Sequence, residues 1–121
     1  MISIIPANVT VETNENGTAY KFDNGFMICV KRVSEQLECT ATWGSLYDTT
    51  TEMNFGSWPV PFIEQPIVSV TTIPGGSGWM GGFFECVKNF SATAAGNSHF
   101  ARATSKTGTV GACVVGFGKW K

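Results

Sequence analysis

Residues 54–73 read NFGSWPVPFIEQPIVSVTTI, and this stretch decides how the chain folds. Its prolines, Pro59, Pro61 and Pro66, lack a backbone donor and therefore belong at strand ends, edges or corners. The run Ile67–Ile73 after them is almost entirely β-branched, which favours a pleated strand. Apolar side chains alternate onto both faces of that strand. We therefore expect it to be central in a sheet, or buried against a second sheet or another subunit.

The composition indicates one all-β domain. A chain of 121 residues can bury a core without disulfides or metals. Its 14 glycines, with many serines and threonines, are typical of short strands joined by tight turns, and no long window shows helical spacing of apolar residues. Charged residues make up only 14% of the chain. Such a surface suits contact with another subunit or with an uncharged, hydroxyl-rich ligand.

Charge and hydropathy argue against two classes of partner. The formal net charge of −1 provides no basic field for nucleic acid. No apolar run is long enough for a membrane span, so no membrane insertion is expected. The first residues, MISIIP, lack a basic region followed by a long apolar core, and we therefore expect no signal peptide.

The four cysteines predict no metal site. They show no CxxC spacing and no histidine at ligand spacing, so neither a metal nor another cofactor is expected. Each lies in an apolar strand segment, where a free cysteine behaves as a small hydrophobe. Reduced cysteines are the favoured interpretation. The alternative is a bridge between Cys29 and Cys39 across a hairpin.

Turn signals divide the rest of the chain into strands. We expect an extended arm at residues 1–17, able to pair with a sheet edge, and one domain at residues 18–121. Asn24-Gly25 between two apolar runs predicts a hairpin, because both residues tolerate positive φ. A second hairpin is expected at Ser34-Glu35-Gln36. The strand after it places these side chains on one face: Leu37, Cys39, Ala41 and Trp43.

The second half of the chain continues the pattern. Strands are expected at residues 67–73, 79–87, 99–104 and 109–121. The Gly81-Gly82 pair predicts a bulge or a close approach of two backbones. Strands of this length at this spacing predict an antiparallel β-sandwich with six to eight short strands.

Three segments, in order along residues 16–121, resemble the receptor-binding tips of bacteriophage tail fibres. Residues 16–29, NGTAYKFDNGFMIC, resemble the family's hairpin of the type NGYYIKFPDGTMICWG. Phe62, Pro66 and the alternating valine strand form the middle element, and residues 116–121, GFGKWK, resemble its closing AIGRWK. The chain departs from the family at Val30-Lys31, where Trp-Gly often stands, and at Lys119, where arginine is usual.

The resemblance implies a homotrimeric tip on the virion that attaches to a carbohydrate of the host cell surface without catalysis. It also allows residues 1–17 to be the remnant of a fibre shaft. The middle element and the last strand are similar, more weakly, to the H-type lectins, which implies a trimeric sandwich with sugar near the subunit edges. The sugar-binding residues of those lectins do not match this chain position by position. A structural trimerisation cap and a bacterial lectin-like protein outside any phage are the alternatives.

Trp79, at the exit of a glycine loop, is the leading candidate for a sugar-binding residue. Aromatic rings stack on the C–H face of a sugar while neighbouring polar groups take its hydroxyls, although core packing of Trp79 is the competing interpretation. Trp43 and Trp120 alternate with core residues and are interpreted as structural. The other candidates lie in turns or corners: Tyr47, Asp48, Trp58, Asn97 and His99.

No motif of the chain predicts catalysis. His99 is the only histidine, and Ser98 beside it points to the opposite face of a strand, so no nucleophile and base pair is expected. The nine carboxylates are scattered singly. A glycosidase using a pair such as Glu64 and Glu85 is the minor alternative. We therefore expect a binding protein and not an enzyme.

Overall fold

A computed structural model describes residues 8–73 and 82–121 of the chain. The described part is all-β, without a helix, which confirms the expected fold class. It has ten strands where six to eight were expected, and the strand at residues 26–43 is much longer than expected. The strands are β1 (Val9–Asn14), β2 (Gly17–Phe22), β3 (Phe26–Trp43), β4 (Leu46–Thr49), β5 (Met53–Asn54), β6 (Ile67–Ile73), β7 (Phe83–Phe84), β8 (Asn97–Ser98), β9 (Phe100–Arg102) and β10 (Lys106–Lys119).

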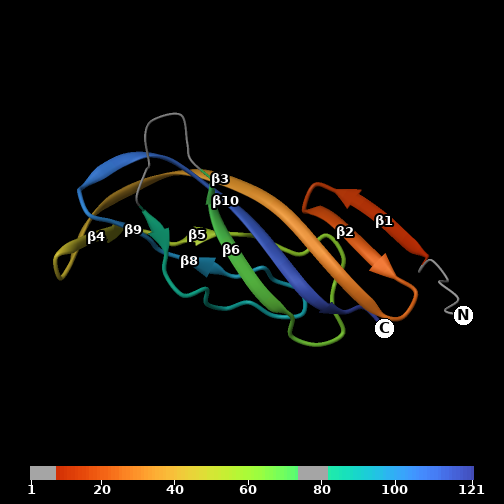
Figure 1. Ribbon diagram of the computed structural model, residues 1–121. Helices are drawn as coiled ribbons and strands as arrows, with labels where there is room; N and C mark the ends of the chain where they lie inside the picture. The colour runs from red at the N-terminus through yellow and green to blue at the C-terminus, as the bar shows by residue number, and fades with distance from the viewer. Residues whose placement is uncertain (1–7, 74–81) are drawn as a thin grey trace, which may run out of the picture.

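One curled antiparallel sheet of eight strands is built around β3 and β10, which run side by side along the elongated molecule (Figure 1). Strand β6 pairs with the other edge of β10. Strands β2 and β1 extend the first half of β3, while β4, β9 and β7 extend its second half. The start of β1 and the C-terminus lie at one end of the molecule, and β4 and β9 lie at the other (Figure 1).

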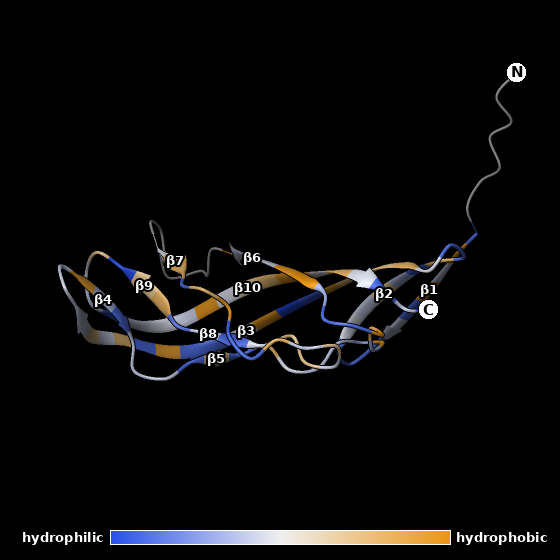
Figure 2. Cartoon of the chain, turned by 90° about the horizontal axis from the view of Figure 1, so that it is seen from below, coloured by the Kyte–Doolittle hydropathy of each residue, from blue (hydrophilic) through white to orange (hydrophobic). Residues whose placement is uncertain are grey.

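The core lies between the inner face of this sheet and a layer of loops that contains the two-stranded sheet of β5 and β8. Buried and more exposed residues alternate along most of β3 and β10, as period-two strands require, and Figure 2 shows hydrophobic residues along both strands. The buried core residues come from both layers: Ala19, Met27, Cys29, Leu37, Cys39, Met53, Phe55, Trp58, Phe62, Ala95, Phe100, Val110, Ala112 and Val114.

The first predicted hairpin is confirmed and the second is wrong. Gly25 takes a φ of 99° in the turn between β2 and β3, and the Asn24 side-chain oxygen accepts a hydrogen bond from the Phe26 N–H at 3.0 Å. No turn occurs at Ser34-Glu35-Gln36, because β3 continues through it and pairs there with β10. That tripeptide contains no residue that favours positive φ, and odd-numbered residues stay on the inner face on both sides of it.

One of the positions expected for Ile67–Ile73, the centre of the sheet, is also wrong. Strand β6 hydrogen-bonds only to β10 among the described strands, so it is an edge strand and not a central one. Val68 and Val70 pack against the core. Ile67, on the other face, is 74% exposed. Within one chain nothing described covers this outer face, so contact with another subunit is the remaining expectation for it.

Smaller expectations have mixed outcomes. Residues 9–14 of the expected arm pair with the sheet edge at β2. The last strand begins three residues early, at Lys106. The strand expected at 79–87 lies partly outside the described residues, and β7 is its described part. The close approach at Gly82 is confirmed, because a Cβ there would lie 2.1 Å from the Phe100 ring.

The cysteines are free thiols. Cys29 and Cys39 lie ten residues apart on one extended strand, hence about 33 Å apart, and cannot bridge. Burial raises the pKa of Cys29 to about 11 and also raises that of Cys39. Cys86, in contrast, is exposed.

These environments predict the order in which the thiols react. At pH 8 in the native protein, a disulfide reagent such as dithiobis(nitrobenzoate) is expected to modify Cys86 quickly and Cys113, which is half-buried, more slowly. Cys29 and Cys39 should react only after unfolding. Simultaneous reaction of all the thiols in the native protein would contradict this assignment.

Candidate functional site

The sheet ends at the hairpin of β3 and β4, where a β-bulge changes the face that side chains take. Cys39 pairs with Thr49 and Ala41 with Asp48, so β3 has one extra residue between these pairs. Cys39 and Thr49 point into the core, and Asp48, as the neighbour of Thr49, points to the outer face. Ala41 and Trp43 lie on the same outer face as Asp48. Trp43 is consequently 47% exposed, and its interpretation as a core residue is wrong.

Trp43 forms one wall of an open cleft of about 380 Å³. The cleft is lined by Trp43, Phe83, Phe84, Glu85, Cys86 and Lys88. Phe83 is 44% exposed, so two accessible aromatic rings face this space. Glu85 and Lys88 add one carboxylate and one ammonium to its rim. The combination of aromatic walls with a few polar groups is typical of small-molecule sites.

The Glu85 carboxyl lies beside that of Asp48, within reach of a hydrogen bond. Its Oε2 atom is buried, and no donor among the described groups reaches it. Burial, and next the charge of Asp48, raise the pKa of Glu85 above its usual value. Ionising the Glu85 carboxyl beside Asp48 therefore costs free energy.

This pair predicts a pH-dependent effect of Glu85→Gln. Below the usual glutamate pKa the wild-type carboxyl is protonated and the two proteins should be equally stable. As the pH rises through the raised pKa of Glu85, the wild type loses stability that the neutral amide retains. At pH 7 we expect the variant to gain about 1 kcal/mol in free energy of unfolding, typical of relieving an unsatisfied buried acceptor. Denaturant melts of both proteins at pH 4 and pH 7 measure this difference in free energy of unfolding. The prediction is contradicted if the variant, compared with the wild type, is less stable at pH 7 than at pH 4.

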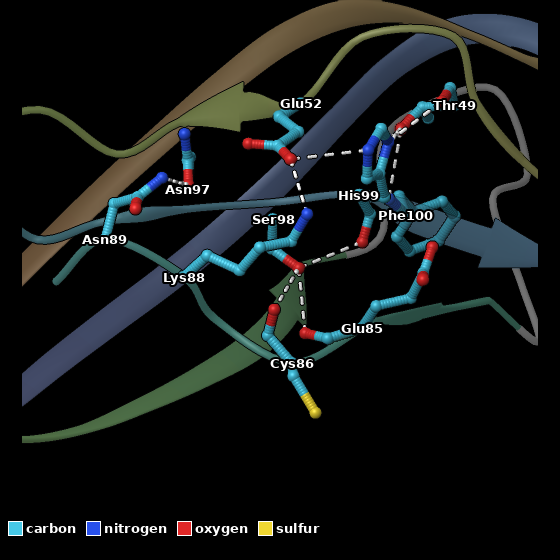
Figure 3. Close-up of polar contacts among 10 residues, drawn as sticks. All are labelled: Thr49, Glu52, Glu85, Cys86, Lys88, Asn89, Asn97, Ser98, His99 and Phe100. Carbon is cyan, nitrogen blue, oxygen red and sulfur yellow. Dashed lines mark hydrogen bonds and ion pairs between the residues drawn. The ribbon is translucent and has the colours of Figure 1, made fainter.

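His99 is held by contacts within the fold (Figure 3). Its Nδ1 lies 2.9 Å from the Thr49 carbonyl oxygen, which can only accept, so Nδ1–H is the donor. Its Nε2 lies 3.4 Å from the Glu52 carboxylate, which also accepts a hydrogen bond from Lys88 Nζ at 2.7 Å. That bond holds the pKa of Glu52 below its usual value. Nδ1 is thus committed to a contact within the fold, and Nε2 faces the Glu52 carboxylate.

The turn residues beside His99 form a similar local network (Figure 3). The Asn97 side-chain oxygen accepts a hydrogen bond from Asn89 at 3.2 Å. Asn97 also pairs with Lys88 through two backbone hydrogen bonds of 2.8 and 2.9 Å. Ser98 is fully buried, and its hydroxyl donates to the Glu85 carbonyl oxygen at 2.8 Å. This network fixes the segment that carries Glu85 and Lys88 to the rim of the cleft.

The structure brings four of the six predicted site residues to this end of the molecule. Strand β4 carries Tyr47 and Asp48 and pairs with β9. Asn97 and His99 lie immediately before β9 in the chain. Their roles differ from one another. Asp48 touches Glu85, whereas the Tyr47 ring packs against the core. Asn97 and His99 support the rim.

The other two predicted residues do not join them. Trp58 is only 3% exposed; it packs edge-on against Phe62, and its Nε1–H donates to the Ser91 carbonyl oxygen at 3.1 Å. No face of its ring is open to a sugar, so its assignment as a ligand-binding residue is corrected to a core residue. Trp79, the leading candidate from the sequence, lies outside the described residues.

The comparisons with known proteins add no assignment. No family model, curated protein or solved structure matches this chain. In the described part of the chain, no three His, Cys, Asp or Glu side chains gather where they could hold a metal ion. No helix there has the length and apolar character that a membrane crossing requires.

Sequence reasoning missed Trp43 and Phe83 as site residues, and it named Glu85 only as half of a minor alternative, a glycosidase pair with Glu64. Trp43 was missed because strict alternation along β3 assigns it to the core, and the bulge that reverses its face has no Gly or Pro as a signal. Phe83 and Glu85 alternate with core residues of β7 in the sequence, so their exposure depends on which face of that strand is covered. Only the pairing of β7 with β9 settles this.

Proposed function

We propose that this chain is the receptor-binding tip of a bacteriophage tail fibre, and that it binds a carbohydrate of the host cell surface without modifying it. The resemblance of residues 16–29, 62–70 and 116–121 to tail-fibre tips supports the identity. The low charge of the chain supports a ligand rich in hydroxyl groups. The single observation that carries the binding function is the cleft walled by Trp43 and Phe83.

The position of the cleft suits a tip. Its lining residues come from the end of β3, from β7 and from the segment after β7. This end of β3 pairs with β4, and β7 pairs with β9. Strands β4 and β9 lie at the end of the elongated molecule opposite the start of β1 and the C-terminus (Figure 1). A shaft attached before β1 would leave this end facing away from the virion. A receptor on a cell surface would therefore meet the cleft first.

The chemistry of the cleft suits a sugar ring. The exposed rings of Trp43 and Phe83 offer flat apolar surface to the C–H face of a pyranose. Glu85 can accept hydrogen bonds from sugar hydroxyls, and Lys88 can donate to them. The polar network of Asn97, His99 and Glu52 holds these groups in place, so little order has to be gained on binding.

Three observations support a role without catalysis. Asp48 and Glu85 are close enough to share a hydrogen bond, which is nearer than the separation of about 5 Å that a retaining glycosidase needs between its two carboxyl groups. Glu64 lines a different hollow from Glu85, so the pair named from the sequence is not brought together. His99 Nδ1 donates to the Thr49 carbonyl oxygen and is therefore committed to the fold.

The test of the proposed function is binding of the purified protein to an array of bacterial surface polysaccharides, and to candidate host cells with and without periodate oxidation of their glycans. We expect saturable binding that periodate abolishes, and no release of reducing sugar. Binding that survives complete periodate oxidation would refute a carbohydrate receptor. Release of reducing ends from a bound polysaccharide would refute the role without catalysis.

We also propose that the protein is a homotrimer. A row of apolar side chains crosses the outer face of the sheet in register: Val11, Tyr20, Ile28, Phe117 and Ile67. All but Ile28 are exposed, Val11 at 56% and Ile67 at 74%. Contiguous apolar surface of this kind is typical of protein interfaces. We include in this proposal the β-sandwich that the resemblance implies. Its second layer would be the loop layer with its small sheet, and not a second large sheet.

Light scattering tests the trimer. We expect a mass about three times the 13.0 kDa of the chain at micromolar concentration. Ile67→Asp should convert the protein to monomers without loss of its fold, because Ile67 contacts little within its own chain. Gln36→Asp, on the same face of β3 but away from the row, is the matched control and should stay trimeric. A wild-type mass of one chain would count decisively against the proposal.

The same apolar row favours one alternative, a structural cap that only registers the fibre. It predicts that the trimer forms while no glycan and no host cell is bound. The array result therefore separates the two functions, since both share the oligomeric state.

A further inference from the structure

A second hollow, of about 340 Å³, lies where the turn between β1 and β2 meets β3. It is separate from the aromatic cleft and has no lining residue in common with it. Its polar lining comes from the end of β1 and the turn after it, from β3 and from β5: Asn14, Glu15, Asn16, Lys31, Arg32 and Asn54. The function proposed above makes no use of it.

Lys31 is the unusual member of this hollow. Its side chain points to the inner face of β3, and the residue is only 6% exposed. Its Nζ donates to the Ser57 carbonyl oxygen at 2.6 Å. An ammonium has three donors, and no carboxylate of the described residues forms an ion pair with this one. Burial lowers the pKa of Lys31, as expected for a cation without a counter-charge.

Two glycines keep the space around this ammonium open. Gly56 has a φ of 78°, and a Cβ at that position would lie 3.1 Å from Lys31 Nζ. Gly17 has a φ of 124°, and a Cβ there would lie 2.4 Å from the Val30 carbonyl oxygen and 2.9 Å from Lys31 Cβ. Side chains are therefore disfavoured on both sides of Lys31, by backbone conformation and by contact. The backbone approaches the lysine closely without covering it.

The charges around the hollow favour an anion. Lys31 contributes a buried cation, and Glu15 contributes one carboxylate, which is exposed to solvent in the turn. Arg32, the next residue of β3, turns its side chain to the opposite face of the strand. Asn14 and Asn16 are linked within the turn by a hydrogen bond of 2.8 Å from the Asn16 N–H to the Asn14 side-chain oxygen. The Asn16 side chain itself remains available to a ligand. The hollow thus combines a buried positive charge with amide groups suited to hydroxyls.

We propose that this hollow binds the carboxylate of an acidic saccharide, with Lys31 as its charge partner. The inference rests on the proposed function in taking the ligand to be a carbohydrate. A carboxylate above Lys31 Nζ would supply the missing counter-charge and accept its remaining donors. The receptor would then carry acidic sugars in addition to the ring held at Trp43.

The experiment uses sodium glucuronate as the probe and follows the backbone amide resonances of Gly17 and Gly56 by NMR. We expect saturable shifts with glucuronate and none with equal concentrations of glucose. Shifts of the same size with glucose would overturn the proposal. So would shifts with sodium sulfate but none with glucuronate, because the hollow would then take an inorganic anion and not a sugar carboxylate.

Lys31→Met keeps the length of the side chain and removes its charge. We expect it to weaken glucuronate binding by roughly 10- to 100-fold, as for the loss of a charge-assisted hydrogen bond, whereas Lys119→Met at the exposed end of β10 should bind normally. Unchanged affinity in Lys31→Met would refute the assignment. Should that variant fail to fold, the Cε resonance of Lys31 in the unsubstituted protein decides, since it must shift with glucuronate.

Binding of glucuronate at Lys31 does not depend on the aromatic cleft. Trp43→Ala is expected to leave the glucuronate shifts at Gly17 and Gly56 unchanged. If array glycans bind at Trp43 while glucuronate leaves both glycines unshifted, the acidic subsite is wrong and the proposed function stands. If glucuronate binds at Lys31 while Trp43→Ala has no effect on array binding, the assignment of the cleft is wrong instead.

Discussion

Replacing Trp58 by alanine is expected to lower the free energy of unfolding by about 3–5 kcal/mol, the usual cost of removing a buried tryptophan. The ring fills the space between the loop layer and the sheet. It packs against Phe62 with ring centroids 5.5 Å apart, and a Cβ on Gly116 would lie 2.8 Å from it. Because Gly116 has no side chain, the Trp58 ring packs directly against its backbone. Alanine would create a cavity there and leave the Ser91 carbonyl oxygen without its donor.

The measurement is a denaturant melt of the wild type and the variant. A domain of this size has about 5–15 kcal/mol of stability in total, so the loss should be large and obvious. Trp43→Ala is the matched control, because Trp43 is exposed and its removal should change stability by no more than about 0.5 kcal/mol. Equal destabilisation by the two substitutions would contradict the burial of Trp58 and the outward face of Trp43.

The second large effect concerns binding. Trp43→Ala is expected to weaken binding of any array glycan by about 1–3 kcal/mol, by analogy with aromatic stacking on other flat ligands. This corresponds to roughly a 5- to 150-fold loss for each site. A trimer that engages three receptors would show a larger loss on cells, because each weakened contact lowers the avidity of the others.

The denaturant melt of Trp43→Ala described above also shows that this variant folds. Ile63→Ala is the control for binding, since Ile63 is an exposed apolar residue of the loop layer that lines neither the cleft nor the apolar row. It should bind as the wild type does. Full binding by Trp43→Ala would make Trp43 an ordinary surface residue, and the cleft would lose its role.

Local sequence signals predicted the features that depend on neighbouring residues. The all-β class followed from alternation and from the absence of helical spacing. The turn at Asn24-Gly25 followed from backbone preference, and Gly25 indeed has a φ of 99°. The close approach at Gly82 followed from a glycine inside a strand pattern.

Features that depend on distant pairing could not be predicted in this way. Whether Ile67–Ile73 is central or at an edge is decided by which strands pair with β10, and β-branched residues suit both positions. The continuity of β3 through Ser34-Glu35-Gln36 is imposed by β10 on its flank. The bulge after Cys39 has no residue that marks it, yet it moves Trp43 from the core to the cleft.

The residues of the candidate site show the same division between local sequence signals and distant strand pairing. The polar residues Asp48, Asn97 and His99 were predicted from their turns, and the pairing of β4 with β9 explains why they lie together. Trp58 was misjudged because a proline corner looks exposed in sequence. The space beneath that corner is filled by the core.

The most direct test of the central claim is a titration of ¹⁵N-labelled protein with a glycan selected on the array, observed at the indole N–H resonances of the tryptophans. Trp43 is predicted to shift with a saturable dependence on ligand. Trp58 and Trp120 are predicted to stay still, because their indole N–H groups donate to the Ser91 and Phe22 carbonyl oxygens at 3.1 and 2.8 Å. A bound glycan that leaves the Trp43 indole unmoved would contradict the claim that this protein recognises its receptor through the cleft at β4 and β9.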